Sequence, residues 1–316
     1  FETNEGTVHA VNGVSLYVKE GETLGIVGES GCGKSVSMMS ILGLIPSPPG
    51  KVVSGKAIFE GNDLIKMPNS ELRKIRGSKI SMVFQDPMTF FNPVLNIWRQ
   101  VSEPLEIHQG IPYKNTFSNV VEVLESVGIS NPKDRIKDYP HQYSGGMRQR
   151  VMIAMALICS PKILIADEPT TALDVTIQAQ IVDLVKRLRD QYGMSIIWIT
   201  HDLSLLAGFA DRINVMYAGY IIEDANVTDL YRNPRHPYSL SLLKSIPRLD
   251  AMEKKHLESI EGIPPVLYSK PDYCPFIDRC QFKIEHCMHE NPSLEEIDDG
   301  HKVACWVDIE KWRTLK

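Results

Sequence analysis

Short hydrophobic runs alternate with amphipathic segments along the first two thirds of the chain. Four runs that end in polar or glycine-rich turns have the pattern of buried strands in a parallel sheet: 24–27, 80–84, 163–166 and 196–199. Between the last two, Ile177, Ile181 and Leu184 fall on one face of a helix, which predicts an amphipathic helix. This alternation predicts an α/β fold with ligand chemistry at the carboxyl edge of the sheet.

Two segments interrupt the alternation. Residues 87–160 have a mostly helical pattern, which predicts a helical subdomain inserted into a sheet domain of residues 1–225. A turn-rich linker at 233–237 precedes a stretch rich in Pro and Cys at 264–316. We therefore expect residues 226–316 to form a linker and a small cysteine-rich C-terminal domain.

The composition is that of a globular protein, with 316 residues of which 43% are hydrophobic and 23% are charged. These values exclude a disordered, collagen-like or coiled-coil chain. The net charge of -5 gives no electrostatic reason to expect nucleic-acid binding. The longest apolar run, 151–159, is far shorter than the roughly 20 residues of a membrane-spanning helix. Cysteine usage and the lack of an apolar leader at the start favour a cytosolic protein.

A glycine-rich loop at residues 28–35 lies between a predicted strand and a predicted helix. Its sequence, Gly-Glu-Ser-Gly-Cys-Gly-Lys-Ser, fits the G-x-x-x-x-G-K-[ST] pattern of phosphate-binding loops. We expect backbone N–H groups to bind a polyphosphate, Lys34 to neutralise it and Ser35 to ligate Mg²⁺. A tight glycine turn with a surface lysine is the alternative, but strand, loop and helix together favour the phosphate loop. The predicted nucleotide-binding residues are Gly28, Ser30, Gly31, Cys32 (through its backbone), Gly33, Lys34, Ser35 and Val36.

Two acidic residues, Asp167 and Glu168, directly follow the run 163–166. The predicted strand places both at the carboxyl edge of the sheet, beside the phosphate loop. Asp167 suits the coordination shell of Mg²⁺, and Glu168 can polarise an attacking water. For an isolated pair, a solvated acidic turn before Pro169 is the alternative.

The segment 143–150, Tyr-Ser-Gly-Gly-Met-Arg-Gln-Arg, precedes an apolar helix. Together with the two motifs above, it resembles the signature of the ATP-binding-cassette (ABC) ATPases. Further matches follow in the family's order: Gln85 resembles the Q-loop glutamine, residues 172–174 the D-loop and His201 the switch histidine. The resemblance covers about residues 8–224 and implies ATP hydrolysis, in which Gln85 touches Mg²⁺ and the attacking water while His201 donates to the γ-phosphate.

The residues Ser144, Gly145 and Gly146 are expected to open a helix and to form a second anion site from its dipole and free N–H groups. The family implies that this site caps the ATP held by the phosphate loop of a partner subunit, so hydrolysis requires a dimer. The commonest family signature has Gln where this chain has Met147, which removes one polar contact to that nucleotide.

Adenine usually stacks on an aromatic residue ahead of the phosphate loop in this family, and the candidates are Phe1 and then His9. In isolation, the other matches also fit a surface glycine turn, a buried histidine and a glutamine at a strand end. Their common order along one chain favours the ATPase.

Two features narrow the resemblance within the family. The Met-Arg-Gln-Arg that follows the signature glycines and the segment 233–247 resemble the ATPase subunits of dipeptide/oligopeptide importers of the DppD/OppD type. That resemblance implies a peripheral protein on the cytoplasmic face of the membrane. Its implied partners are a second ABC ATPase subunit, two transmembrane permease subunits and an extracytoplasmic peptide-binding protein.

Two alternatives to a peptide importer stay open. Close relatives import nickel or another small solute, and soluble ABC ATPases act on nucleic acid or ribosomes. Soluble relatives of this kind commonly carry a second cassette or a long coiled-coil insertion, and this sequence has neither. Its acidic balance also argues against a nucleic-acid partner.

Four cysteines near the C-terminus follow a C-x5-C-x6-C-x17-C spacing: Cys274, Cys280, Cys287 and Cys305. A region this poor in apolar residues usually needs a cross-link for stability, and four thiolates can hold zinc or an iron–sulfur cluster. The wide gaps favour a 4Fe-4S cluster, which some peptide-importer ATPases similar to this chain carry. Zn²⁺ and free or disulfide-bonded thiols are the alternatives. A redox enzyme would need a substrate pocket near these cysteines, and the sequence predicts none.

Overall fold

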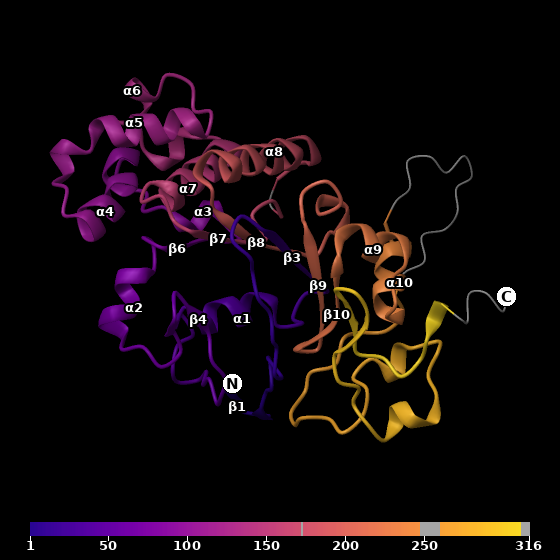
Figure 1. Ribbon diagram of the computed structural model, residues 1–316. Coiled ribbons are helices and arrows are strands. Elements are labelled where there is room, and N and C mark those ends of the chain that lie inside the picture. The colour runs from indigo at the N-terminus through magenta and orange to yellow at the C-terminus, as the bar shows by residue number, and fades with distance from the viewer. Residues whose placement is uncertain (172, 247–259, 311–316) are drawn as a thin grey trace, which may run out of the picture. The chain divides into compact units, whose positions relative to one another are not determined.

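The computed structural model describes residues 1–171, 173–246 and 260–310. Contacts divide the chain into two compact units. Figure 1 labels the helices and strands of both. Unit 1 consists of residues 1–17, 24–57 and 200–316, and unit 2 of residues 18–23 and 58–199. Both units have an α/β composition, because each contains strands of a sheet and helices.

Unit 1 contains a mixed sheet with the strand order β11-β12-β10-β9-β3. Strand β3 (Thr23–Val27) is buried along its whole length and pairs in parallel with β9 (Arg212–Tyr217). The antiparallel part consists of β10 (Tyr220–Asn226), β12 (His301–Val303) and β11 (Glu295–Asp298). The C-terminal segment therefore extends the sheet of unit 1 and does not separate as a unit of its own.

The remaining elements of unit 1 are short. They are β1 (Glu2–Thr3), β2 (Gly6–Thr7), α1 (Lys34–Ile41), α9 (Val227–Arg232), α10 (Pro237–Lys244), and the 3-10 turns η3 (Leu203–Leu205), η4 (Ile277–Arg279) and η5 (Glu285–Met288).

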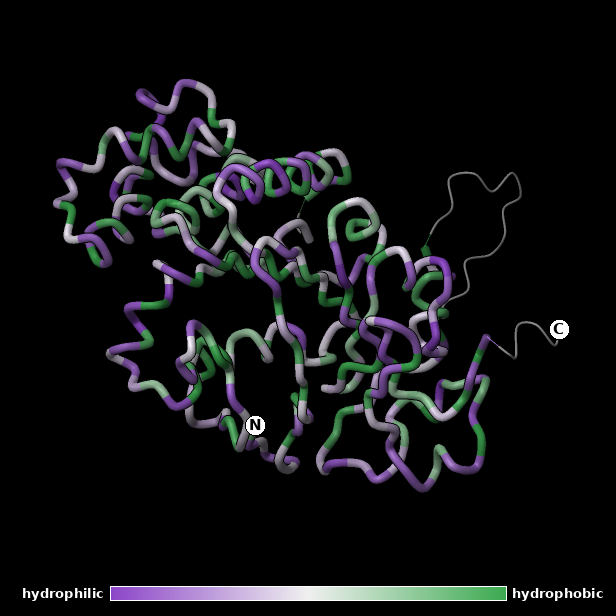
Figure 2. Tube along the Cα trace, in the orientation of Figure 1, coloured by the Kyte–Doolittle hydropathy of each residue, from purple (hydrophilic) through white to green (hydrophobic). Residues whose placement is uncertain are grey.

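Unit 2 contains parallel strands in the order β8 (Ser195–Thr200), β7 (Ile163–Asp167) and β6 (Ile80–Val83). Helix α8 (Val175–Tyr192) connects β7 to β8. It buries Ile181, Leu184 and Leu188, and hydrophobic and hydrophilic residues alternate along it (Figure 2). The strands and the amphipathic helix predicted from the sequence are thereby confirmed.

Five helices lie between β6 and β7: α3 (Pro87–Phe90), α4 (Ile97–Gln109), α5 (Phe117–Ser126), α6 (Pro132–Arg135) and α7 (Gly145–Leu157). Helices α4 and α5 pack against α7. All five helices belong to unit 2, together with β6 and β7. Asn96 caps α4 by accepting from the Arg99 backbone N–H at 2.9 Å. Unit 2 also holds β4 (Ile58–Phe59), β5 (Asn62–Asp63), α2 (Asn69–Ile75), η1 (Tyr113–Asn115) and η2 (Pro140–Gln142).

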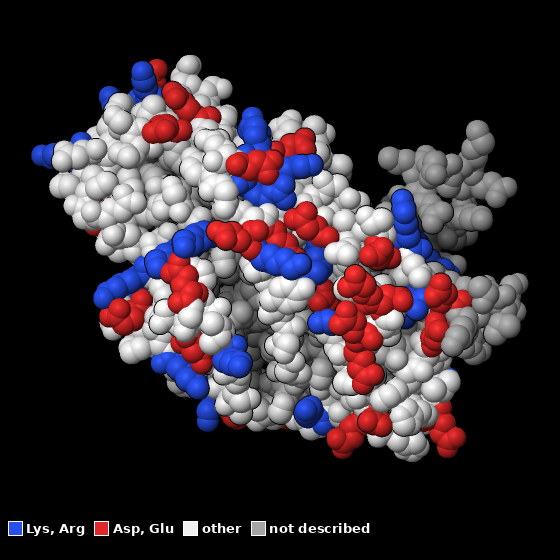
Figure 3. Space-filling view, viewed as in Figure 1, with Lys and Arg blue, Asp and Glu red and all other residues white. Residues whose placement is uncertain are grey.

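The surface carries mixed charge. Lys and Arg side chains are interspersed with Asp and Glu over the face shown in Figure 3. Among the described residues, no helix has the length and apolar character that crossing a bilayer requires.

Candidate nucleotide site

The phosphate loop runs directly from β3 into α1, as the sequence predicts. Two of its glycines, Gly28 and Gly33, are required by the close approach of neighbouring backbone. A Cβ atom at Gly28 would lie 2.2 Å from the Met216 carbonyl oxygen, and one at Gly33 would lie 2.4 Å from that of Ala10. Gly33 also has a φ of 100°, a conformation that residues with side chains rarely adopt.

Lys34 lies inside this loop, and the residue is only 4% exposed. Its Nζ donates to the carbonyl oxygens of Gly28 at 2.7 Å and Glu29 at 3.0 Å. The Cys32 sulfur is 3.9 Å from the same nitrogen. The loop thus holds a buried cation in contact with its own backbone. Of the other predicted loop residues, Cys32 and Gly33 are buried, Gly28 is buried, Ser35 and Val36 are half-buried, and Ser30 and Gly31 are exposed.

In unit 2 the structure brings Gln85 and Glu168 together. Strands β6 and β7 pair in parallel with Val83 opposite Ala166, so the residues after their carboxyl ends lie close to each other. Gln85 Nε2 donates to Glu168 Oε2 at 3.3 Å, and Thr171 Oγ1 donates to the same oxygen at 3.0 Å. Thr171 was not predicted as a site residue, because its only signal is its position three residues after the acidic pair.

The two acidic residues have different backbone settings. Asp167 is the last residue of β7 and is 7% exposed. Glu168 has a φ of 44°, and its backbone N–H donates to the Ile199 carbonyl of β8 at 3.0 Å. The chain therefore leaves the strand at Glu168 in a conformation that is uncommon for a residue with a side chain.

The signature segment opens α7 as predicted. Ser144 is the N-cap residue, and its hydroxyl accepts from the Met147 backbone N–H at 3.3 Å. Gly145 and Gly146 form the first turn of this helix, where the helix dipole favours an anion. In the D-loop match, Ala172 lies outside the described residues, while Asp174 caps α8 through the Ile177 backbone N–H at 3.0 Å.

The last predicted nucleotide residues lie in unit 1. His201 directly follows β8 and is exposed. Phe1 is half-buried, with its α-amino group donating to the Val8 carbonyl at 2.8 Å, and His9 is exposed. Unit 1 thus holds the phosphate loop, both adenine candidates and His201, while unit 2 holds Gln85, the acidic pair and the signature segment.

The sequence profile described as "ABC transporter" matches residues 11–171. The chain belongs to the ABC transporter family. As an ABC ATPase it binds and hydrolyses ATP. A second profile, "Oligopeptide/dipeptide transporter, C-terminal region", matches residues 222–287 of this ABC ATPase.

Relatives match this ABC ATPase along nearly its full length. It is 50% identical to a dipeptide transport ATP-binding protein, DppD, of Bacillus subtilis, over 98% of this chain and 92% of the relative. It is 48% identical to an oligopeptide transport ATP-binding protein, OppD, of Haemophilus influenzae, over 99% of this chain and 95% of the relative. Among solved structures, a dimeric ATP-binding cassette in a post-hydrolysis state with ADP and Pi is similar with a TM-score of 0.63 and 30% identity. That match covers 72% of this chain and 94% of the cassette.

The four C-terminal cysteines of this ABC ATPase line one pocket. None of them forms a disulfide. Burial raises the pKa of the Cys274 thiol to about 11 and that of Cys305 to about 12. Within the part of the chain that the structure describes, no three His, Cys, Asp or Glu residues are grouped as a site for one metal ion.

Proposed function

We propose that this ABC ATPase powers the import of dipeptides or oligopeptides through a membrane transporter. The observation that carries the proposal is the match of residues 222–287 to the C-terminal region of oligopeptide and dipeptide transporters. That match lies outside the cassette match at residues 11–171, so ATP hydrolysis alone does not account for it. The relatives named as dipeptide and oligopeptide transport proteins support the same solute class.

In this proposal the phosphate loop binds the triphosphate of ATP. The N–H groups at the start of α1 and the Lys34 ammonium neutralise it, because both present positive charge at one helix N-terminus. Phe1, with His9 as the second candidate, stacks on adenine. Ser35, Gln85 and Asp167 would hold Mg²⁺, which supplies further charge neutralisation to the phosphates.

Hydrolysis then depends on a polarised water. Glu168 accepts a proton from the attacking water, and its carboxylate is oriented by Gln85 and Thr171, which both donate to Oε2. His201 donates to the γ-phosphate, where negative charge develops in the transition state.

We further propose that two ATPase subunits close on ATP. Ser144, Gly145 and Gly146 of one subunit cap the nucleotide on the phosphate loop of the other, which is a second copy or a related subunit. The dimeric cassette with ADP and Pi supports such an arrangement. In this proposal the helical segment at 87–160 acts as the subdomain that transmits closure to two permease subunits. The protein then lies on the cytoplasmic face of the membrane, and an extracytoplasmic binding protein delivers the peptide.

The proposal predicts peptide-dependent ATP turnover. In vesicles containing this ATPase, its permease subunits and the binding protein, we expect hydrolysis to rise several-fold when a dipeptide or an oligopeptide is added. The control omits the binding protein and should show only basal hydrolysis. Stimulation by nickel instead of peptides, or purification with ribosomes and nucleic acid instead of permease subunits, would contradict the proposed function.

We also propose that the cysteine pocket holds a 4Fe-4S cluster with a structural role. Cys274, Cys280, Cys287 and Cys305 supply four soft donors, and when bound they would be thiolates. Burial raises the pKa of the Cys274 and Cys305 thiols, so these two would lose their protons on binding. Loading is therefore expected to release protons and to weaken at low pH.

The cluster proposal predicts the metal content of the purified protein. Anaerobically purified protein should be brown and contain iron and sulfide at about four each. Cys280→Ser should lose most of the iron. Cys159→Ser is the matched control, because this cysteine does not line the pocket, and it should keep the iron. A colourless protein loaded with zinc would overturn the assignment.

A further inference from the structure

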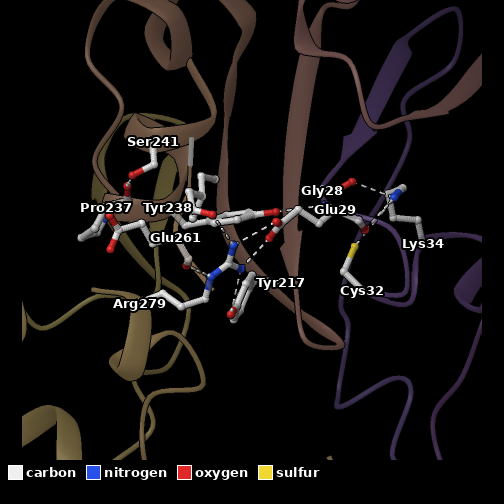
Figure 4. A network of polar contacts seen from close by, with 11 residues as sticks. Gly28, Glu29, Cys32, Lys34, Tyr217, Pro237, Tyr238, Ser241, Glu261 and Arg279 are labelled. Atoms are coloured by element: carbon white, nitrogen blue, oxygen red, sulfur yellow. Dashed lines mark hydrogen bonds and ion pairs between the residues drawn. The ribbon is translucent and has the colours of Figure 1, made fainter. Parts of the chain in front are cut away.

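An ion pair between Arg279 and Glu29 connects the segment that contains the cysteine pocket to the phosphate loop. Arg279, which precedes Cys280, donates from Nη1 to Glu29 Oε2 at 2.7 Å and from Nη2 to Glu29 Oε1 at 3.0 Å (Figure 4). Glu29 is the second residue of the phosphate loop. The Arg279 side chain is 6% exposed, and that of Glu29 is 27% exposed. Such a bidentate pair fixes geometry as well as charge.

The guanidinium of Arg279 uses all five of its N–H donors. Besides the two bonds to Glu29, Nη1 donates to the Tyr217 hydroxyl at 3.3 Å. Nε donates to the Glu261 carbonyl at 2.8 Å, and Nη2 to the Ile260 carbonyl at 3.3 Å. A buried arginine with every donor paired holds one orientation, because any rotation would leave a donor without its acceptor.

A second contact holds the backbone of Glu29. Its N–H donates at 2.9 Å to the hydroxyl of Tyr238, a fully buried residue of α10. The Tyr238 ring packs against Tyr217 and Phe276, with centroid separations of 4.8 Å and 5.4 Å. Phe276 lies three residues before Arg279, so the same C-terminal segment supports both contacts to Glu29 (Figure 4 shows the polar ones).

These contacts reach the nucleotide-binding lysine through one peptide group. The carbonyl of Glu29 accepts from Lys34 Nζ at 3.0 Å, so the position of Glu29 helps to set the position of the ammonium. The carboxylate of Glu29 points toward Arg279 and belongs to the loop that would bind the polyanion (Figure 4). Without Arg279 its negative charge would be uncompensated there and would repel the phosphates.

We propose that Arg279 is a positioning residue for ATP binding. It neutralises Glu29 and holds the start of the phosphate loop in the conformation that accepts the triphosphate. A structural change in the segment around Cys280 would therefore change the affinity for ATP. The inference depends on ATP binding by the phosphate loop, and not on peptide import or on what the cysteine pocket holds.

A double-mutant cycle tests the inference with a non-hydrolysable ATP analogue. Arg279→Gln should weaken analogue binding about tenfold, because it leaves the Glu29 carboxylate unpaired. The combined variant Arg279→Gln with Glu29→Gln should recover most of that loss, because the repelling charge is gone. A purely structural role of Arg279 predicts no recovery, and a double variant that binds no better than the single one would refute the proposal.

The control is Arg235→Gln, which removes another mostly buried arginine of unit 1. Arg235 pairs with Asp298 at 3.5 Å and contacts the C-terminal segment instead of the phosphate loop. Its loss should leave the Kd of the analogue unchanged. In steady-state hydrolysis, Arg279→Gln should raise KM for ATP and leave kcat close to that of the unaltered protein, because Glu168 and Gln85 are untouched.

A second measurement uses the unaltered protein and does not depend on the folding of a variant. Because coupling between two sites is reciprocal, the bound analogue should slow amide hydrogen exchange in the peptide 274–287. That peptide contains the Arg279 N–H, which donates to Phe276 at 3.1 Å. Equal exchange of this peptide with and without the analogue would also refute the proposal.

Discussion

Replacing Glu168 by Gln is expected to leave ATP binding intact and to slow ATP turnover by about 100-fold or more. The change keeps the size of the side chain and its ability to accept from Gln85 and Thr171, which donate to Oε2 at 3.3 Å and 3.0 Å. It removes the carboxylate that accepts a proton from water. The loss should therefore fall on kcat, while the Kd for ATP stays near that of the unaltered protein.

This result is measured by single-turnover hydrolysis together with equilibrium binding of ATP. The matched control is Glu125→Gln, the same chemical change at an exposed position of α5 in the same unit. The control should hydrolyse ATP at the normal rate. Near-normal turnover in Glu168→Gln would remove Glu168 as the residue that activates water, and loss of ATP binding would assign it to the binding of nucleotide instead.

The parallel strands could be predicted because their signal is local. The runs at 24–27 and 163–166 are continuous apolar stretches that end in turns, and they correspond to β3 and β7 within one residue at each end. The hairpin of β9 and β10 was not predicted from the sequence. In the structure, Ala218 and Gly219 form its turn, with φ values of 47° and 82°. Polar residues such as Arg212 and Asn214 interrupt the apolar pattern of β9 while being buried there.

The C-terminal strands illustrate what no local pattern encodes. Strand β12 joins the sheet by pairing Val303 with Glu223, residues far apart in the chain. Glu223 is fully buried and accepts from the backbone N–H of His236 at 3.0 Å, with His301 Nε2 at 2.8 Å from the same carboxylate. The Pro- and Cys-rich composition therefore showed where the alternation of strand and helix patterns ends. It gave no indication that this segment would complete the sheet of unit 1.

The candidate site also contains one contact that the sequence could predict and one that it could not. Gln85 and Glu168 could be placed together because each follows a predicted parallel strand, and the carboxyl ends of neighbouring strands meet at one edge. The pair of Glu29 with Arg279 joins residues that are 250 positions apart. Glu29 occupies a variable position of the phosphate-loop pattern, so the motif itself assigns it no role.

Replacing Lys34 by Ala is expected to weaken ATP binding about 100-fold, because the ammonium that would neutralise the triphosphate is lost. The physical reason lies in the loop itself. Lys34 is the buried cation there, and its removal leaves the carbonyl oxygens of Gly28 and Glu29 without the ammonium that they contact. Equilibrium binding of ATP measures the loss, and Lys51→Ala, at an exposed lysine of the same unit, is the matched control with unchanged affinity.

Lys34→Arg should also bind poorly, because a guanidinium does not fit where a 4% exposed ammonium contacts two carbonyls. Normal binding by Lys34→Ala would mean that backbone N–H groups alone hold the triphosphate, and the loop would then bind anions through the helix N-terminus without this side chain.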